Sequence, residues 1–312
     1  MNERHSFSSS RKTRLSIIAA LLVIHTLASI SPAQSKDTRR LEARIRELIA
    51  ASGAETVGVA FYDLATRSEL LINPDERFHA ASTMKVPVMM EIFRQATEGR
   101  FSLDDKIAIK NEFTSIADGS RYSLSPESDS EGTLYKRLGE RETIRELMRL
   151  MIDMSSNLAT NILIEMVAPQ RVMELMNKMG ANNIRVLRGV EDGKAFEKGL
   201  NNTTTARDLM ILLRHIAERK AVSMAASDEM IEVMLDQKFN EGIPAGLPPA
   251  ARVAHKTGSI TRINHDAAIV FLPSRKPYAL VALTRGIEEE KRAHRLIADI
   301  SRAVYDFLSR ND

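Results

Sequence analysis

The sequence contains no cysteine and no tryptophan among its 312 residues, and aromatic residues make up only 5% of it. Without cysteine the chain can form no disulfide and can carry no lipid on an N-terminal cysteine. A thiolate metal site is excluded for the same reason, and the histidines show neither H-x-H nor H-E-x-x-H spacing. We therefore expect no metal and no other cofactor.

The apolar run at residues 15–24 is too short for an ordinary membrane span. Basic residues precede it at Arg11, Lys12 and Arg14, and the small residues of 31–33 follow it. This order is typical of a secretory signal peptide. We expect residues 1–33 to be cleaved on export, which leaves a periplasmic or secreted protein with no stable membrane span.

The net charge of +3 is small and arises from the start of the chain. Residues 1–33 hold four basic residues and one acidic residue, so residues 34–312 carry 40 of each sign. A formally neutral chain offers no basic surface for nucleic acid. We expect no nucleic-acid partner, and we expect residues 34–312 to form one catalytic domain that is a monomer.

Strand patterns lie near both ends of residues 34–312, and helical patterns lie between them. The predicted strands are 56–63, 70–72, 252–259, 265–272 and 278–284, with helices over 40–51 and 288–309 outside them. This order predicts an α/β unit built from about 34–81 and 245–312, in which an antiparallel sheet is flanked by helices. An all-α unit of about 82–244 is inserted into it.

Ser82 and Lys85 begin a predicted helix. A serine hydroxyl is a poor nucleophile until a base removes its proton, and a lysine three residues later on a helix lies on the same face. The first turn of a helix also has unpaired N–H groups, and the helix dipole there favours developing negative charge. The pattern alone is weak, because Ser9 and Lys12 repeat it and because a capping serine beside a solvated lysine explains it too.

A second candidate is the triplet Ser155-Ser156-Asn157, which lies between two predicted helices. A serine and an amide at a helix junction place a proton-transferring hydroxyl beside a hydrogen-bonding group. Helix capping explains the same residues. By itself the triplet favours capping.

A third candidate is Lys256-Thr257-Gly258 on a predicted strand. The cation and the hydroxyl suit a substrate carboxylate, and glycine allows another backbone to approach closely. The N–H of Ser259 could bind an oxyanion. The alternative is an edge strand with an exposed lysine.

Together and in this order, the three motifs resemble the signature elements of class A β-lactamases and penicillin-binding proteins. The resemblance covers about residues 40–310 and implies the β-lactamase/transpeptidase-like fold. It implies that Ser82 is the acyl-forming nucleophile and that Lys85 takes or relays its proton. The N–H groups of Ser82 and Ser259 would form the oxyanion hole.

The resemblance also implies roles for the remaining motif residues. Ser155 would pass a proton to the departing lactam nitrogen, and Asn157 would hold the side-chain amide of the substrate. Lys256 and Thr257 would bind its carboxylate. The family pattern has aspartate where this chain has Ser156, a tolerable departure because the outer two residues of the triplet carry the contacts.

The loop of residues 188–202 departs further from the family pattern. Class A enzymes resemble one another in an arginine followed shortly by a glutamate, in an E-x-x-L-N pattern, and that glutamate activates the water that frees the enzyme. Anchoring the loop at Arg188 and at residues 202–205 selects Glu191, whereas the short pattern selects Glu197. We favour Glu191, because loop ends constrain geometry more firmly than a five-residue match.

These residues predict hydrolysis of the β-lactam ring of penicillin- and cephalosporin-type antibiotics through a serine acyl-enzyme, as in a class A-like serine β-lactamase. One alternative is a penicillin-binding D-alanyl-D-alanine peptidase with slow deacylation, which would act on peptidoglycan peptides. The other is a non-catalytic domain that senses β-lactams or the cell wall. The rate at which the acyl-enzyme is hydrolysed distinguishes the β-lactamase from the penicillin-binding peptidase.

Other features are interpreted from local pattern. Residues 101–141 predict a long, serine-rich loop, which either rims the site or is an unconstrained surface excursion. Ser227 is expected to cap the helix that follows it. His265 and Asp266 are expected to form a local hydrogen-bonded pair, and His255 to pack within its strand.

Overall fold

The computed structural model describes residues 36–310, with side chains from Thr38 onwards, and the predicted signal peptide lies outside these residues. The helices are α1 (Lys36–Ser52), α2 (Lys85–Thr97), α3 (Ile144–Asp153), α4 (Asn157–Val167), α5 (Pro169–Lys178), α6 (Gly193–Glu197), α7 (Ala206–Ala217), α8 (Met224–Leu235) and α9 (Glu290–Ser309). The strands are β1 (Thr56–Asp63), β2 (Glu69–Ile72), β3 (Phe78–His79), β4 (Lys106–Ala108), β5 (Phe113–Thr114), β6 (Arg121–Tyr122), β7 (Arg141–Thr143), β8 (Thr203–Thr204), β9 (Arg252–Ile260), β10 (Ile263–Phe271) and β11 (Tyr278–Arg285). Three 3₁₀ turns join them among the described residues, η1 (Ala81–Met84), η2 (Leu134–Arg137) and η3 (Ile243–Gly246).

Strands from both ends of the chain form one five-stranded antiparallel sheet in the order β2-β1-β11-β10-β9. β1 pairs with β11 along its whole length, from Thr56 opposite Arg285 to Asp63 opposite Tyr278. The predicted fold class is confirmed, and β9, which carries the Lys256 motif, is an edge strand.

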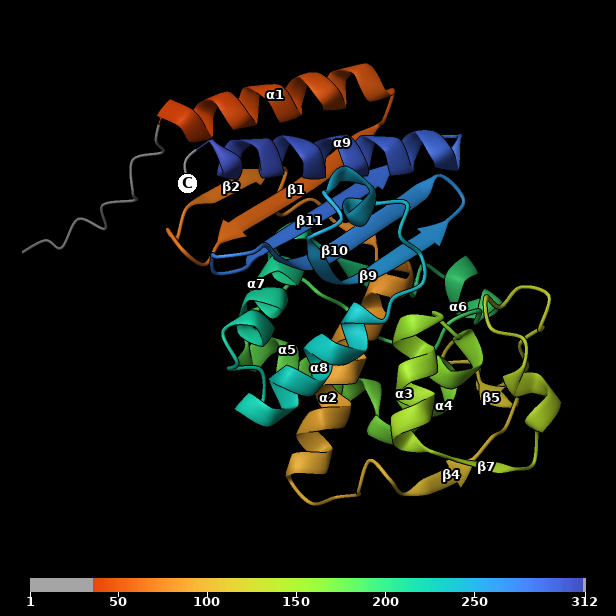
Figure 1. The fold of residues 1–312 in the computed structure, drawn as a ribbon. Helices are drawn as coiled ribbons and strands as arrows, with labels where there is room; N and C mark the ends of the chain where they lie inside the picture. The colour runs from red at the N-terminus through yellow and green to blue at the C-terminus, as the bar shows by residue number, and fades with distance from the viewer. Residues whose placement is uncertain (1–35, 311–312) are drawn as a thin grey trace, which may run out of the picture. The chain divides into compact units, whose positions relative to one another are not determined.

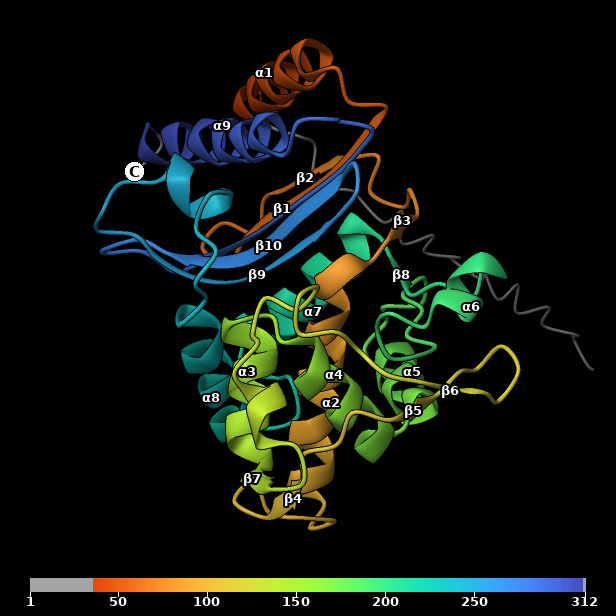
Figure 2. The ribbon, with the colours of Figure 1, turned by 90° about the vertical axis from the view of Figure 1, so that its right-hand side faces the viewer.

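Helices cover both faces of this sheet (Figures 1 and 2). α1 and α9 pack on one face, where alternate residues of β1 such as Val59 and Phe61 join their apolar core. The intervening residues, such as Ala60 and Tyr62, face α7 and the helical part of the chain. Because side chains alternate across a strand, one strand contributes to two separate cores.

α2 runs through the middle of the helical part (Figure 2). Its residues from Lys85 to Phe93 are all buried, which a helix surrounded by others requires. At its N-terminal end the η1 turn lies against β9 and β10. The first residues of α2 therefore meet the edge strand of the sheet.

The cap of α8 differs from the prediction. Ser223, not Ser227, is the N-cap residue: its backbone is extended and its hydroxyl accepts from the N–H of Ala226 at 3.1 Å. Ser227 lies inside the helix, and its hydroxyl donates to the carbonyl of Ser223 at 2.8 Å. Either serine could cap from local pattern alone, and the extended backbone at Ser223 decides which one does. None of the helices between residues 36 and 310 is long and apolar enough to cross a membrane.

Candidate active site

Ser82 lies in the η1 turn, directly after Ala81, whose φ of +44° is unusual for a residue with a side chain. The turn is pressed against Gly258 of β9. A Cβ atom on Gly258 would lie 3.0 Å from the nitrogen of Ser82 and 3.1 Å from that of Thr83. Glycine therefore lets the strand approach the serine turn more closely than almost any residue with a side chain would.

A cavity of about 260 Å³ opens beside Ser82. It is lined by hydroxyl, amide and carboxylate groups from the η1 turn, the 128–130 segment, the start of α4, β9, β10 and α9. Its polar lining residues include Ser82, Ser128, Ser130, Ser155, Asn157, Thr257 and Ser259. The three sequence motifs thus meet at one cavity.

Lys85 is fully buried, with 0% of its surface exposed. Its ammonium donates to the carbonyl of Ser155 at 2.6 Å, to the hydroxyl of Ser155 at 3.1 Å and to Oδ1 of Asn157 at 3.0 Å. Among the hydrogen bonds of residues 36–310, none joins Lys85 Nζ to Ser82 Oγ. Burial and then the charge of Lys256 lower the pKa of Lys85 well below its ordinary value, which favours the neutral amine that can accept a proton.

The Ser155 hydroxyl lies between two lysines. Lys256 Nζ donates to it at 3.0 Å, and Lys85 Nζ donates to it at 3.1 Å. Lys256 is also 0% exposed, and burial lowers its pKa to about 7, although Asp266 and Asp153 oppose this shift. The edge-strand lysine is therefore not exposed, and one hydroxyl connects two amines that can exchange protons.

Glu191 reaches the site, whereas Glu197 does not. Asn157 Nδ2 donates to Glu191 Oε1 at 2.7 Å, and the hydroxyl of Ser128 donates to Glu191 Oε2 at 3.1 Å. Glu191 has a φ of +59°, a strained conformation of the kind that is often found at functional sites. Glu197 is the last residue of α6. Both carboxylates are exposed and neither is among the residues that line the cavity, but within residues 36–310 only Glu191 bonds to a motif residue.

Hydrogen bonds hold both ends of the loop that carries Glu191. The buried guanidinium of Arg188 donates to the carbonyl of Leu200 at 2.9 Å and to Oδ1 of Asn201 at 3.1 Å. Asn161 of α4 binds the backbone N–H of Val190 at 2.6 Å and its carbonyl at 3.0 Å. These bonds determine the path of the backbone on both sides of Glu191.

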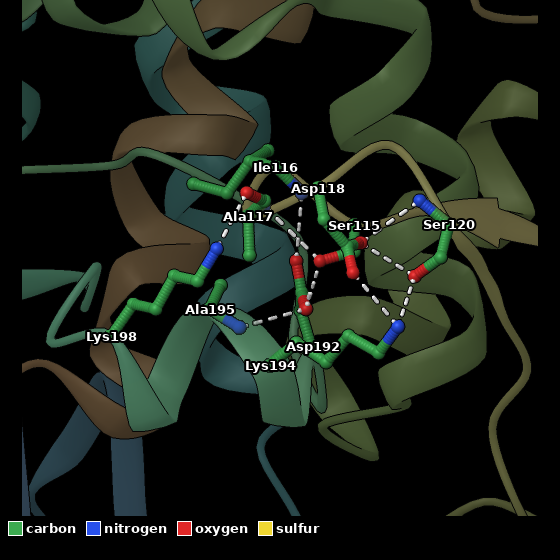
Figure 3. Close-up of polar contacts among 9 residues, drawn as sticks. All are labelled: Ser115, Ile116, Ala117, Asp118, Ser120, Asp192, Lys194, Ala195 and Lys198. Atoms are coloured by element: carbon green, nitrogen blue, oxygen red, sulfur yellow. Dashed lines mark hydrogen bonds and ion pairs between the residues drawn. The ribbon is translucent and has the colours of Figure 1, made fainter.

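The middle of the same loop is tied to the 115–120 segment (Figure 3). Asp192 accepts from the hydroxyl of Ser115 at 2.7 Å and from the N–H of Ile116 at 3.0 Å, and it also caps α6. Lys194 donates to Asp118 at 2.9 Å. The 101–141 excursion is therefore a rim of the site and not an unconstrained surface loop.

The structure corrects the predicted histidine pair. Asp266 bonds to His255 Nδ1 at 2.9 Å, and not to His265, whose Nε2 lies 2.9 Å from the carbonyl of His79. Consecutive strand residues point to opposite faces, so neighbours in sequence cannot pair there. Sequence reasoning also missed Ser128, Asp129 and Ser130, for which no local signal other than the serine-rich composition existed.

Ser82 and Ser155 thus line one cavity, and two fully buried lysines bond to the hydroxyl of Ser155. A sequence model of the β-lactamase enzyme family matches residues 40–308. A β-lactamase of Bacteroides uniformis is 28% identical over 308 residues, which cover 93% of this chain and 98% of that protein. The chain belongs to the β-lactamase enzyme family, and its relatives indicate β-lactamase-type serine hydrolase activity.

Solved structures agree with this assignment. An ancestral (GNCA) class A β-lactamase is 25% identical with a TM-score of 0.74, and the match covers 85% of this chain and 99% of that one. A mutant of PBP-A, solved as an acyl-enzyme complex with penicillin G, is 26% identical with a TM-score of 0.74. That match covers 87% of this chain and 97% of PBP-A.

Proposed function

We propose that the protein hydrolyses the β-lactam ring of penicillin- and cephalosporin-type antibiotics through an acyl-enzyme on Ser82, as a class A-like serine β-lactamase. The observation that carries the proposal is the hydroxyl of Ser155, which bridges two fully buried lysines at 3.0 and 3.1 Å beside Ser82. Buried amines joined by a hydroxyl supply both a base and a proton path. Neither requires a metal or a cofactor.

In acylation, Ser82 Oγ attacks the lactam carbonyl carbon and its proton passes to neutral Lys85. The C–N bond of the lactam breaks, and the proton reaches the departing nitrogen through the hydroxyl of Ser155. The N–H groups of Ser82 and Ser259 stabilise the oxyanion. Lys256, together with Thr257, binds the carboxylate of the substrate by charge and hydrogen bonding.

In deacylation, the Glu191 carboxylate removes a proton from a water molecule, which attacks the acyl carbonyl and releases Ser82. Support comes from the position of Glu191, which shares Asn157 with Lys85. Asn157 would bind the side-chain amide of the substrate. We further propose that the protein is exported after removal of residues 1–33 and acts as a monomer.

A penicillin-binding D-alanyl-D-alanine peptidase with slow deacylation is the second candidate. It is favoured by one contact: the Glu191 carboxylate already occupies the amide N–H₂ of Asn157 at 2.7 Å, which restrains it from positioning a water. The similarity to PBP-A, a mutant of which was solved as an acyl-enzyme complex with penicillin G, points the same way. Peptidoglycan peptides would then be the physiological substrates.

Rapid-mixing kinetics with a chromogenic cephalosporin, followed by intact mass, tests these proposals. Sustained turnover with a transient adduct, lost in Ser82→Ala, supports the β-lactamase. Glu191→Gln should then accumulate the adduct, while Glu197→Gln, the matched control in the same loop, should turn over like the parent. A single burst with a lasting adduct indicates the second candidate, and no adduct at all indicates a non-catalytic sensing domain.

A further inference from the structure

The segment of residues 128–131 contacts the turn that leads into α4. Asp129 accepts from the N–H of Asn157 at 2.9 Å with each carboxylate oxygen, and from the N–H of Leu158 at 2.9 Å. The hydroxyl of Ser130 donates to the carbonyl of Met154 at 2.7 Å. A segment that is 28 residues away in sequence therefore binds both sides of the Ser155 turn.

These bonds complete the N-terminus of α4. The first N–H groups of a helix have no partner within the helix, and the N-cap residue Ser156 satisfies only that of Ala159, at 3.2 Å. The carboxylate of Asp129 takes the N–H groups of Asn157 and Leu158, and a negative charge is favoured at this end of a helix. The hydroxyl of Tyr135 donates to the same carboxylate at 2.9 Å and orients it.

The turn that is held in this way carries reactive groups in a strained conformation. Ser155 has a φ of +57°, which costs free energy for a residue with a side chain. Its carbonyl and hydroxyl bind Lys85, and Asn157 binds Lys85 and Glu191. External bonds are needed to keep such a turn in one geometry, because the strain favours relaxation.

We propose that Asp129 is a positioning residue, whose carboxylate holds the Ser155–Asn157 turn so that the Ser155 hydroxyl lies between Lys85 and Lys256. Asp129 acts through the turn and touches no reacting atom. This chain has Ser156 where the family pattern has aspartate, and Asp129 brings a carboxylate to the same turn from the rim. The consequence for acylation rests on the proposed function, whereas the consequence for the turn does not.

The first experiment measures the turn itself. Asp129→Ala and Asp129→Asn should raise amide hydrogen exchange at residues 155–158 by about tenfold, the factor that one net hydrogen bond supplies, while exchange in α7 stays unchanged. Glu127→Gln, whose carboxylate accepts from Ser125 in the same loop, is the control and should exchange like the parent. Unchanged exchange at residues 155–158 in the Asp129 variants would overturn the proposal.

The second experiment measures acylation. The rate of adduct formation on Ser82 under single-turnover conditions should fall by about tenfold to a hundredfold in Asp129→Ala, the loss expected when a catalytic group is misplaced. KM should change little by comparison. Formate ions should restore part of the rate in Asp129→Ala but leave the parent and Glu127→Gln unaffected, because formate can fill the vacated carboxylate position.

The outcomes separate the two proposals. An adduct that forms but never turns over refutes hydrolysis and still reports the effect of Asp129 on acylation. If the parent forms no adduct, the proposed function fails, and the exchange measurement alone decides whether Asp129 holds the turn. An acylation rate in Asp129→Ala equal to that of the parent would overturn the positioning role.

Discussion

Replacing Lys256 by arginine should change the pH dependence of the enzyme. The pKa of Lys256 is lowered to about 7 by burial, so half of its amine is charged at pH 7 and only about 1% at pH 9. If the charged amine binds the substrate carboxylate, kcat/KM should fall about fiftyfold between these pH values. Titration of Lys85 should instead raise kcat/KM with increasing pH, because its neutral form is the base. The fall in kcat/KM at high pH, the falling limb of the profile, is therefore assigned to Lys256.

Arginine stays charged throughout this range, so Lys256→Arg should flatten the falling limb. Its kcat/KM at pH 7 should be lower than that of the parent, because a planar guanidinium does not reproduce the compact ammonium that donates to Ser155 at 3.0 Å. The assay is kcat/KM for a chromogenic cephalosporin from pH 5.5 to 9.5, with each variant normalised to its maximum. A parallel fall in both proteins, or no fall in the parent, would refute the reasoning.

Two further substitutions test the structure. Gly258→Ala places a methyl 3.0 Å from the nitrogen of Ser82, so β9 must move away and the rate of covalent labelling at Ser82 should fall by about a hundredfold. Gly193→Ala is the control: its methyl would meet nothing within 4 Å, and its labelling rate should equal that of the parent. Burial raises the pKa of the Asp153 carboxyl to about 7, so its contribution to stability is present below about pH 4 and is lost as the pH rises through 7. The free energy of unfolding of Asp153→Asn, relative to that of the parent, should therefore rise by at most about 4 kcal/mol between pH 4 and pH 8. Urea unfolding measures it, and a difference between the two proteins that stays constant with pH would contradict this.

Local pattern was sufficient for most elements. Alternation of apolar residues predicted β1 over residues 56–63, and the structure has that strand at Thr56–Asp63. At the start of α3, the hydroxyl of Thr143 accepts from the N–H of Glu146, a capping contact between residues three positions apart. These signals are local, because side-chain periodicity and capping involve residues only a few positions apart.

Parts of the site could not be predicted in this way. Whether Glu191 or Glu197 faces the other motif residues depends on the bonds from Arg188 and Asn161 that determine the loop path. The approach of Asp129 to α4 depends on how residues 101–141 pack. Such contacts join residues far apart in sequence, so no local pattern encodes them.

The sequence by itself determined the order of the five main strands and of the helices outside them, and the chemical types at the three motifs. Hydrophobic periodicity and residue chemistry are properties of short segments. Only the tertiary structure decided that Lys85 and Lys256 are fully buried and that both bond to the hydroxyl of Ser155. Burial is what lowers the pKa of each amine, and it results from the packing of α2, α4 and β9 around them.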